Sequence, residues 1–226
     1  MNPKKFAISA IAFSVLATGA FAATVDASST SSLEADIQKK TKETKEYNKK
    51  WSNKIDEKAV VQASKDYGMS TKEAEVAAKK KKDRVGAVLA TTDTGASSGK
   101  LVGHAGIIHP DSTKYTVESY PGKGKGVKKH KNNWTKRGYK HLKKMYVKKA
   151  SKTKHKAAAK YAKSKIGKPY NYNFVSKEAT KKYYCSQLVW QAWKKKGGKN
   201  LDYDGGPSVW PVDLIKSKHT VAYYNK

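Results

Sequence analysis

Apolar and hydroxyl side chains in the first third of the chain recur at steps of three and four residues. They form a narrow stripe on a segment otherwise rich in Lys and Glu: Leu33, Ile37, Thr41, Thr44, Tyr47, Trp51 and Ile55. This period predicts a basic amphipathic helix with a thin apolar face, which either packs on the domain that follows or forms loose helix in solution. A second helix is predicted from Ser70 to about Lys82, because Ser70 and Glu73 form a capping box.

The pattern changes near Arg84, where short apolar runs typical of strands begin. They cover residues 85–89, 102–108, 115–118, 145–147 and 220–224. Turn residues at 109–112 predict that the second and third runs pair as a hairpin. Residues 122–131 are rich in Gly and Lys and are predicted to form a loop.

Helical patterns lie between the early strands and the last one. One is predicted over residues 151–166, with Ser151 as its N-cap and Gly167 at its end. The next begins at Cys185 and carries an apolar face, and a short turn or helix is predicted near residues 211–215. Strands grouped before and after helices predict one α+β domain over residues 84–226.

The first 22 residues have the features of a signal peptide. Lys4 and Lys5 precede a short apolar run over residues 6–21, and Ala20-Phe21-Ala22 fits the small-x-small rule for cleavage. The run is too short and too abruptly followed by polar sequence for a membrane span. We therefore expect a secreted or wall-associated protein, with a lysine-rich helical arm or linker at residues 23–83 and no transmembrane segment after cleavage.

Basic residues strongly outnumber acidic ones. The chain has 48 Lys and Arg against 18 Asp and Glu, a formal net charge of +30 at pH 7. Such a field attracts polyanions. Export argues against nucleic acid and leaves anionic wall polymers or acidic lipids as partners of the expected monomer. Because the lysines spread over the whole chain, general solvation of the surface is as well supported as a docking patch.

Cys185 is the only cysteine. A lone thiol in an exported chain cannot form an internal disulfide, so packing or reactivity must explain it. At the first turn of a helix, unpaired amide groups and the helix dipole favour the thiolate. A buried apolar role for Cys185 is the alternative, and the residue pattern alone leaves both open.

A thiol nucleophile needs a base and a group that orients the base. His104 lies between Gly103 and Gly106 at the start of an apolar strand, and Glu118 follows on the next strand, where its carboxylate can accept a ring N–H. A structural hydrogen bond is the alternative for His104. The remaining histidines lie in polar stretches and are expected to be solvated: His109, His130, His141, His155 and His219.

Several linked motifs resemble the papain-like NlpC/p60 cysteine hydrolases of bacterial envelopes. They are Gly-His-Ala-Gly-Ile-Ile (103–108), Val-Glu-Ser (117–119), Ile-Gly-Lys-Pro-Tyr (166–170), Tyr-Cys-Ser-Gln-Leu-Val (184–189) and Pro-Val-Asp-Leu (211–214). Because His104 precedes Cys185, the order resembles the circularly permuted YiiX/YebB-like branch. The resemblance spans residues 84–224 and implies a permuted papain-like α+β fold, with the sheet strands that carry His and Glu before the helix that carries Cys.

The resemblance also implies roles for individual residues. Cys185 would be the nucleophile, His104 the general base and acid, and Glu118 the residue that orients His104. Tyr170 would line the substrate cleft. Many unpermuted members have a second His where Glu118 stands.

The implied activity is that of a secreted cysteine hydrolase that cleaves an amide or peptide-like bond of the envelope, such as a peptidoglycan peptide, through a thioester. An acyl hydrolase or acyltransferase for lipid-linked substrates is an alternative, and a non-catalytic, basic envelope-binding protein is another. No cofactor is implied. No metal site is predicted, since one Cys and scattered His lack the spacing of metal ligands.

Overall fold

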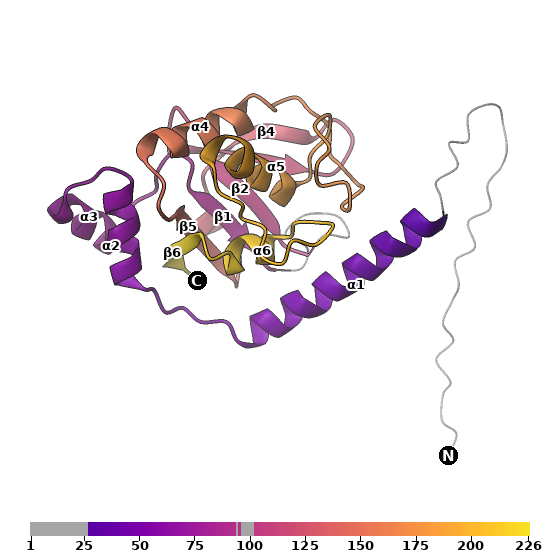
Figure 1. Cartoon of the computed structure of the whole chain (residues 1–226), viewed down its shortest axis with the longest axis horizontal. Helices are drawn as coiled ribbons and strands as arrows, with labels where there is room; N and C mark the ends of the chain where they lie inside the picture. Colours follow the sequence, from indigo (N-terminus) through magenta and orange to yellow (C-terminus); the bar gives the residue numbers. More distant parts are fainter. Residues whose placement is uncertain (1–26, 94, 96–101) are drawn as a thin grey trace, which may run out of the picture.

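The computed structural model describes residues 27–93, 95 and 102–226 of the chain, so the predicted signal peptide lies outside the described residues. The central element is a six-stranded sheet in the order β4-β3-β2-β1-β5-β6, with neighbouring strands antiparallel (Figure 1). Its strands are β1 (Val88–Thr91), β2 (His104–Ile108), β3 (Tyr115–Tyr120), β4 (Gly126–Lys131), β5 (Leu142–Val147) and β6 (Thr220–Asn225). The predicted α+β class is confirmed.

Helices surround this sheet. They are α1 (Ala27–Lys49), α2 (Glu57–Asp66), α3 (Thr71–Lys79), α4 (Lys152–Lys163), α5 (Cys185–Ala192) and α6 (Pro211–Lys216). A short 3-10 helix spans Trp134–Lys136, and a π-helical turn, Trp193–Gly197, continues α5. Within the part of the chain that the structure describes, every helix is too short or too polar to cross a membrane.

Both faces of the sheet are buried. Val88 and Ala90 of β1 join the hydrophobic cluster that contains α4 and α5. Leu89, which points to the opposite face, joins a second cluster with Val60 of α2. Burial on both faces explains why the strands read as continuous apolar runs.

One predicted loop is a strand. The prediction for residues 122–131 is wrong because residues 126–131 form β4, which pairs with β3 along its whole length from Tyr115↔Lys131 to Tyr120↔Gly126. The ladder outweighs the low strand propensity of lysine, and exposed lysines suit an edge strand because they oppose pairing with another chain.

The helical arm differs in detail from its prediction. Helix α1 ends at Lys49, so the last two stripe positions, Trp51 and Ile55, lie in the connection. The sequence did not predict α2, which is capped by Asp56 through a hydrogen bond from the backbone N–H of Ala59 (3.0 Å). The capping box at Ser70 is confirmed at the start of α3.

The arm packs on the sheet domain. Leu33, Ile37 and Tyr47 of α1 contact the cluster that contains α5. Lys40, in the middle of α1, is fully buried. The domain boundary at residue 84 stays a prediction, although side chains from both sides of it share one hydrophobic cluster.

Candidate active site

The cysteine lies at the first position of α5. The preceding residue, Tyr184, is the N-cap, and its backbone N–H donates to Oε1 of Gln187 (3.0 Å). Ser119 of β3 donates its hydroxyl to the carbonyl of Tyr183 (2.6 Å), which ties this helix end to the sheet. Cys185 is therefore held at a helix N-terminus, as the sequence predicted, and its side chain is buried.

His104 and Glu118 face each other on adjacent strands. His104 Nε2 lies 2.8 Å from Oε2 of Glu118, and both side chains are fully buried. Gly106 pairs directly with Glu118, and a Cβ at Gly106 would lie 2.8 Å from Cγ of Glu118. A glycine is needed at this position because the carboxylate-bearing side chain occupies that space.

The other ring nitrogen of His104, Nδ1, is buried and has no hydrogen-bond partner within the described ranges, and the Cys185 thiol lies near enough to the ring to affect its pKa. Burial by itself lowers the pKa of His104. Polar interactions of the ring with Cys185 and Glu118, together with the charges of these two residues, outweigh burial and raise the pKa to about 9. The fold thus brings together the three residues singled out from the sequence, with an imidazolium at neutral pH.

Several groups besides His104 bind the carboxylate of Glu118. Arg137 binds it with two nitrogens, Nη1 at 2.7 Å and Nη2 at 2.9 Å, and Trp134 Nε1 donates at 3.0 Å. The hydroxyl groups of Thr116 and Tyr120 also donate to it. Burial would raise the pKa of Glu118, but bonds from His104 and Arg137 hold it well below its usual range, so the group is a carboxylate.

Sequence reasoning missed this shell. Two signals for it are present in the sequence. Thr116 and Tyr120 stand two residues from Glu118 on one strand, so all three share a face. Arg84 and Arg137 are the two arginines among 48 basic residues, and a planar guanidinium suits two-point binding of a carboxylate better than lysine does.

Two aromatic rings fix the plane of the imidazole. The Tyr120 ring lies 4.2 Å from the His104 ring, and the Trp134 ring lies 5.4 Å from it and nearly parallel, at 12°. Together with Glu118, they leave His104 little freedom to rotate. A fixed ring is what a proton carrier for one thiol requires.

Tyr170 belongs to the same buried cluster as Cys185, and its place in a substrate cleft stays a prediction. Its side chain is buried, and its hydroxyl has no hydrogen-bond partner among the residues that the structure describes. Burial, and then the charge of Cys185, raises the pKa of Tyr170, so this hydroxyl keeps its proton. It is therefore a hydrogen-bond donor without a partner among the described residues.

Two other histidines correct the sequence prediction. His155 was expected to be solvated but is fully buried, and burial lowers its pKa to about 4. It lies on the apolar face of α4 with Ala158 and Ala162, while the lysines occupy the other face. His109 is also buried, at 5% exposure. The lysines next to these histidines in the sequence did not indicate that the histidine side chains lie on a buried face.

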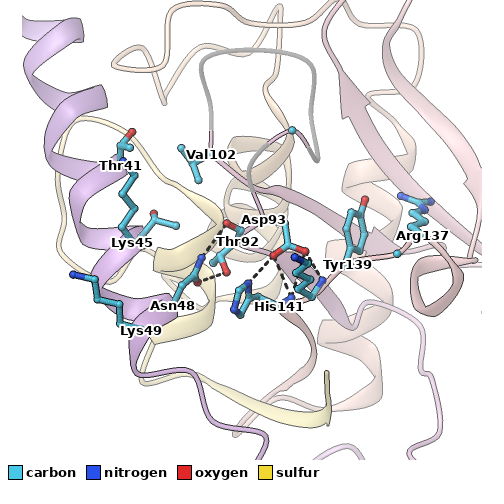
Figure 2. Close-up of a pocket in the computed structure, with 14 residues that line it drawn as sticks. Thr41, Lys45, Asn48, Lys49, Thr92, Asp93, Val102, Arg137, Tyr139 and His141 are labelled. Carbon is cyan, nitrogen blue, oxygen red and sulfur yellow. Dashed lines mark hydrogen bonds and ion pairs between the residues drawn. The ribbon is translucent and has the colours of Figure 1, made fainter.

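A pocket of about 860 Å³ opens between α1 and residues 137–141 (Figure 2). Asn48 of α1 and Thr92 both line this pocket, and the Thr92 hydroxyl donates to Oδ1 of Asn48 (2.6 Å). The acidic side chain in the lining, Asp93, already binds His141 Nδ1 at 2.7 Å. The pocket reaches the site described above at Arg137.

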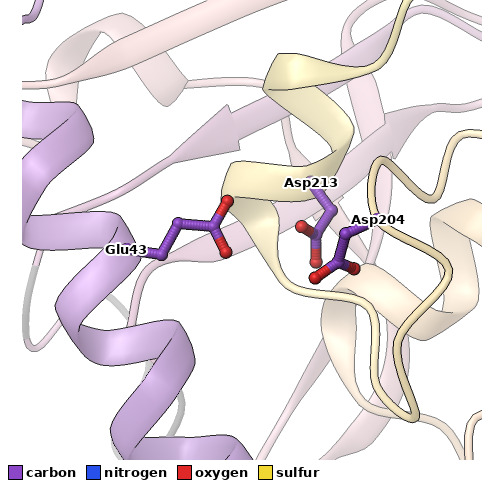
Figure 3. A group of neighbouring side chains, drawn as sticks. All are labelled: Glu43, Asp204 and Asp213. Carbon is purple, nitrogen blue, oxygen red and sulfur yellow. The ribbon is translucent and has the colours of Figure 1, made fainter.

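A group of three acidic side chains lies between α1 and the C-terminal segment: Glu43, Asp204 and Asp213 (Figure 3). Their ligand atoms lie within 4.8 Å of one another. The Lys40 ammonium fills the space, at 2.6 Å from Asp213, 3.0 Å from Asp204 and 3.5 Å from Glu43. It supplies the positive charge that a metal ion would, so this group offers no open cation site.

Arg137 acts through Glu118, and its replacement tests that role. Arg137→Met should lower the free energy of unfolding by about 2 to 4 kcal/mol, because it leaves a buried carboxylate short of a cation. Arg137→Lys should lose less, since it keeps the charge and loses the two-point contact. Urea unfolding measures the loss of stability in both variants, and the rate of Cys185 alkylation measures the effect of each replacement on the site. Equal stability of the Met and Lys variants would contradict an electrostatic role.

Comparisons with known proteins give one relative by sequence and one by structure. Over 73 residues, 31% of its length, the chain is 40% identical to the uncharacterized protein YycO of Bacillus subtilis (strain 168). The match spans 30% of that relative. The crystal structure of metalloprotein yiiX from Escherichia coli O157:H7 superimposes with a TM-score of 0.50 at 16% identity, and covers 64% of this chain and 98% of that one. At this identity the likeness shows the fold.

The sequence model of one family matches residues 48–203, more than half of the chain. Its description is "Permuted papain-like amidase enzyme, YaeF/YiiX, C92 family". The matched segment includes Cys185, His104, Glu118 and Tyr170. The predicted resemblance to the permuted YiiX-like branch is confirmed, as is the class of cysteine peptidase or amidase-type hydrolase. The chain belongs to the permuted papain-like amidase family.

Proposed function

We propose that this protein is a secreted cysteine amidase that cleaves an amide bond of the bacterial cell envelope, with a peptidoglycan peptide as the substrate. The observation that carries the proposal is a buried thiol at a helix N-terminus beside an imidazolium, which Glu118 holds in place. This pair supplies a nucleophile and an acid at neutral pH.

Acylation follows from the arrangement. The Cys185 thiolate attacks the carbonyl carbon, a C–S bond forms, and the carbonyl oxygen takes the electron pair. When the C–N bond breaks, His104 gives its proton to the leaving amine, and a thioester remains. Neutral His104 then takes a proton from water as the water oxygen attacks the thioester, the C–S bond breaks, and a carboxylic acid leaves. The thiolate and the imidazolium are restored.

The transient oxyanion needs donors. The first backbone N–H groups of α5 have no partner within the helix and point to this end. The Tyr170 hydroxyl is a second donor, because it is buried, protonated and without a partner among the described residues. In comparable sites one such donor contributes about 3 kcal/mol.

The envelope as location is supported by the sequence. A signal-like start and a net charge of +30 favour an exported protein that approaches anionic wall polymers or acidic lipids. Elution from isolated envelopes by moderate salt is the behaviour that such a charge-driven association would show.

Product analysis tests the function. The mature protein and its Cys185→Ser variant are incubated separately with muropeptides and with phospholipids, and the products are identified by mass spectrometry. We expect new amines from muropeptides with the parent alone. Release of free fatty acids instead would replace the amidase proposal with an acyl hydrolase. Binding without any product, unchanged in Cys185→Ser, would replace it with a binding protein.

The raised pKa of His104 predicts a dependence of stability on pH. The folded pKa of about 9 exceeds the unfolded value of 6.5, so His104 stabilises the fold fully below pH 6.5 and this contribution is lost as pH rises to about 9. Urea unfolding of the parent and of His104→Gln across pH 6 to 10 measures it. The advantage of the parent should shrink through this window, and a constant difference would contradict the predicted imidazolium.

A further inference from the structure

A second pocket, of about 470 Å³, borders the proposed active site at the β4 edge of the sheet. Its lining comprises Tyr120, Lys125, Gly126, Lys128, His130, Lys131, Asn133 and Arg137. None of these residues except Tyr120 and Arg137 takes part in the contacts that hold Glu118.

Three residues of the lining contact parts of the site: Tyr120, Arg137 and Gly126. Tyr120 packs on the His104 ring, with ring centroids 4.2 Å apart. Arg137 binds Glu118. Gly126 lies against the segment before Tyr170, because a Cβ at Gly126 would meet the carbonyl of Lys168 and the backbone of Pro169. A group bound in this pocket therefore lies next to the residues that position His104 and Glu118.

The lining is cationic and contains no carboxylate. Lys125, Lys128 and Lys131 make no ion pair with any residue of the described ranges, and all three are exposed. His130 adds a ring nitrogen, Nε2, that is buried and has no hydrogen-bond partner there. The nearest acid, Glu118, is neutralised by Arg137 and His104.

Arg137 is not one of the free donors. Its Nε donates to Asn133, Nη1 donates to Glu118 and Tyr120, and Nη2 donates to Glu118 and the Lys131 carbonyl. These five bonds use its five N–H groups. Recognition in the pocket is left to the three lysines and His130.

Protection of an edge strand does not by itself explain these lysines. Lys129, on the same strand, has no place in the lining and lies over the Tyr115 ring at 4.6 Å. Lys125 comes before β4, in the turn closed by its N–H to the carbonyl of Gly122 (3.1 Å). Lys125 of the turn and Lys128 and Lys131 of the strand line one hollow, whereas edge protection asks only for lysines along the strand.

We propose that this pocket is an anion subsite, which binds a carboxylate or phosphate group that the acyl substrate carries close to the bond it presents to Cys185. The inference rests on the proposed function, since it gives the substrate class of the same site. Charge-assisted hydrogen bonds from the lysines and His130 would orient that group. Neutral acyl substrates would lack this anchor.

Competition with a neutral alkylating reagent tests the subsite in the mature protein. The rate of Cys185 alkylation by iodoacetamide is measured at constant ionic strength with increasing glutarate, a carboxylate probe, or glycerol phosphate, a phosphate probe. Each rate is divided by that of the same variant without anion. We expect saturable protection by one or both probes, and the stronger probe identifies the group. In the Lys125→Gln, Lys128→Gln, Lys131→Gln triple variant, half-protection should need about tenfold more anion.

Two matched controls separate the pocket from the general charge. Lys129→Gln removes a lysine of the same strand, and the triple variant Lys152→Gln, Lys156→Gln, Lys160→Gln removes the same charge from the exposed face of α4. Both should keep the protection of the parent. Equal loss in the α4 variant, or no protection in the parent, would overturn the subsite.

A binding measurement keeps the two proposals distinguishable. Isothermal titration of the same proteins with glutarate and glycerol phosphate needs no reactive thiol. If iodoacetamide labels Cys185 slowly in the parent, the proposed function fails, and titration still decides the subsite. Binding that the pocket triple variant loses and the α4 variant keeps supports it; equal binding in all proteins overturns it.

Discussion

Replacement of His104 by alanine should slow alkylation of Cys185 by about a hundredfold at pH 6.5, because the variant lacks the imidazolium that stabilises a thiolate and a free cysteine is only about 1% ionised at that pH. In the parent, His104 carries its positive charge up to a pKa of about 9, beside the thiol. Timed labelling with iodoacetamide, read by mass spectrometry of the intact protein, measures the ratio.

Two further variants sharpen this result. Glu118→Gln keeps a hydrogen-bond partner for the ring but removes the charge that favours the imidazolium, so its rate should fall between those of the parent and His104→Ala. His219→Ala, at the start of β6 on the opposite edge of the sheet, should label like the parent. Equal rates in the parent and in His104→Ala would remove the basis for a thiolate and imidazolium pair.

Replacement of Lys40 by methionine should lower the free energy of unfolding by about 3 to 5 kcal/mol at pH 8, the range for removal of one partner from a buried ion pair. Lys40 and Asp213 are both fully buried, and their charged atoms lie 2.6 Å apart. Without the ammonium, the buried Asp213 would lose its cation and face Glu43 and Asp204 (Figure 3), although Lys216 would still pair with Glu43 at 2.5 Å and Lys39 with Asp204 at 3.6 Å. Urea unfolding monitored by circular dichroism measures the loss.

The effect of Lys40→Met should depend on pH. Burial raises the pKa of Asp213 to about 6, although Lys40 acts in the opposite direction, so this carboxyl takes up a proton in the folded state more readily than in the unfolded chain. Removal of Lys40 strengthens that tendency. The difference between parent and variant should therefore narrow below about pH 6, where protonation relieves the repulsion. Lys39→Met, whose side chain is 67% exposed, should change stability by less than about 0.5 kcal/mol. An equally large loss in both variants would show that Lys40 acts through packing of α1.

The candidate nucleophile, base and orienting acid were predictable because each has a local signature. Cys185 is the only thiol and starts an amphipathic helix, and His104 is set between glycines on a strand. Glu118 follows on the paired strand, which places it across from β2. The residues around Glu118 were not predicted as a group, because Trp134 and Arg137 come from the segment after β4 and their contacts depend on where that segment crosses the sheet.

The helical arm was likewise predicted only in part. The stripe from Leu33 predicted an amphipathic helix, and Leu33, Ile37 and Tyr47 of α1 pack against the domain. The sequence did not predict that a lysine in this stripe region would be fully buried, since an isolated ammonium is costly to remove from water. Three acids from distant parts of the chain make that burial favourable.

By itself, the sequence determined the α+β class, the helix that presents the thiol, and the pairing of the His104 and Glu118 strands, because periodicity, caps and turns act over a few residues. Only the tertiary structure decided that Gly126–Lys131 is an edge strand, that Arg137 clamps Glu118, that Lys40 neutralises three carboxylates, and that lysines without an ion pair line a pocket beside the site. Each of these depends on pairing or charge compensation between residues far apart in the chain, which local patterns do not specify.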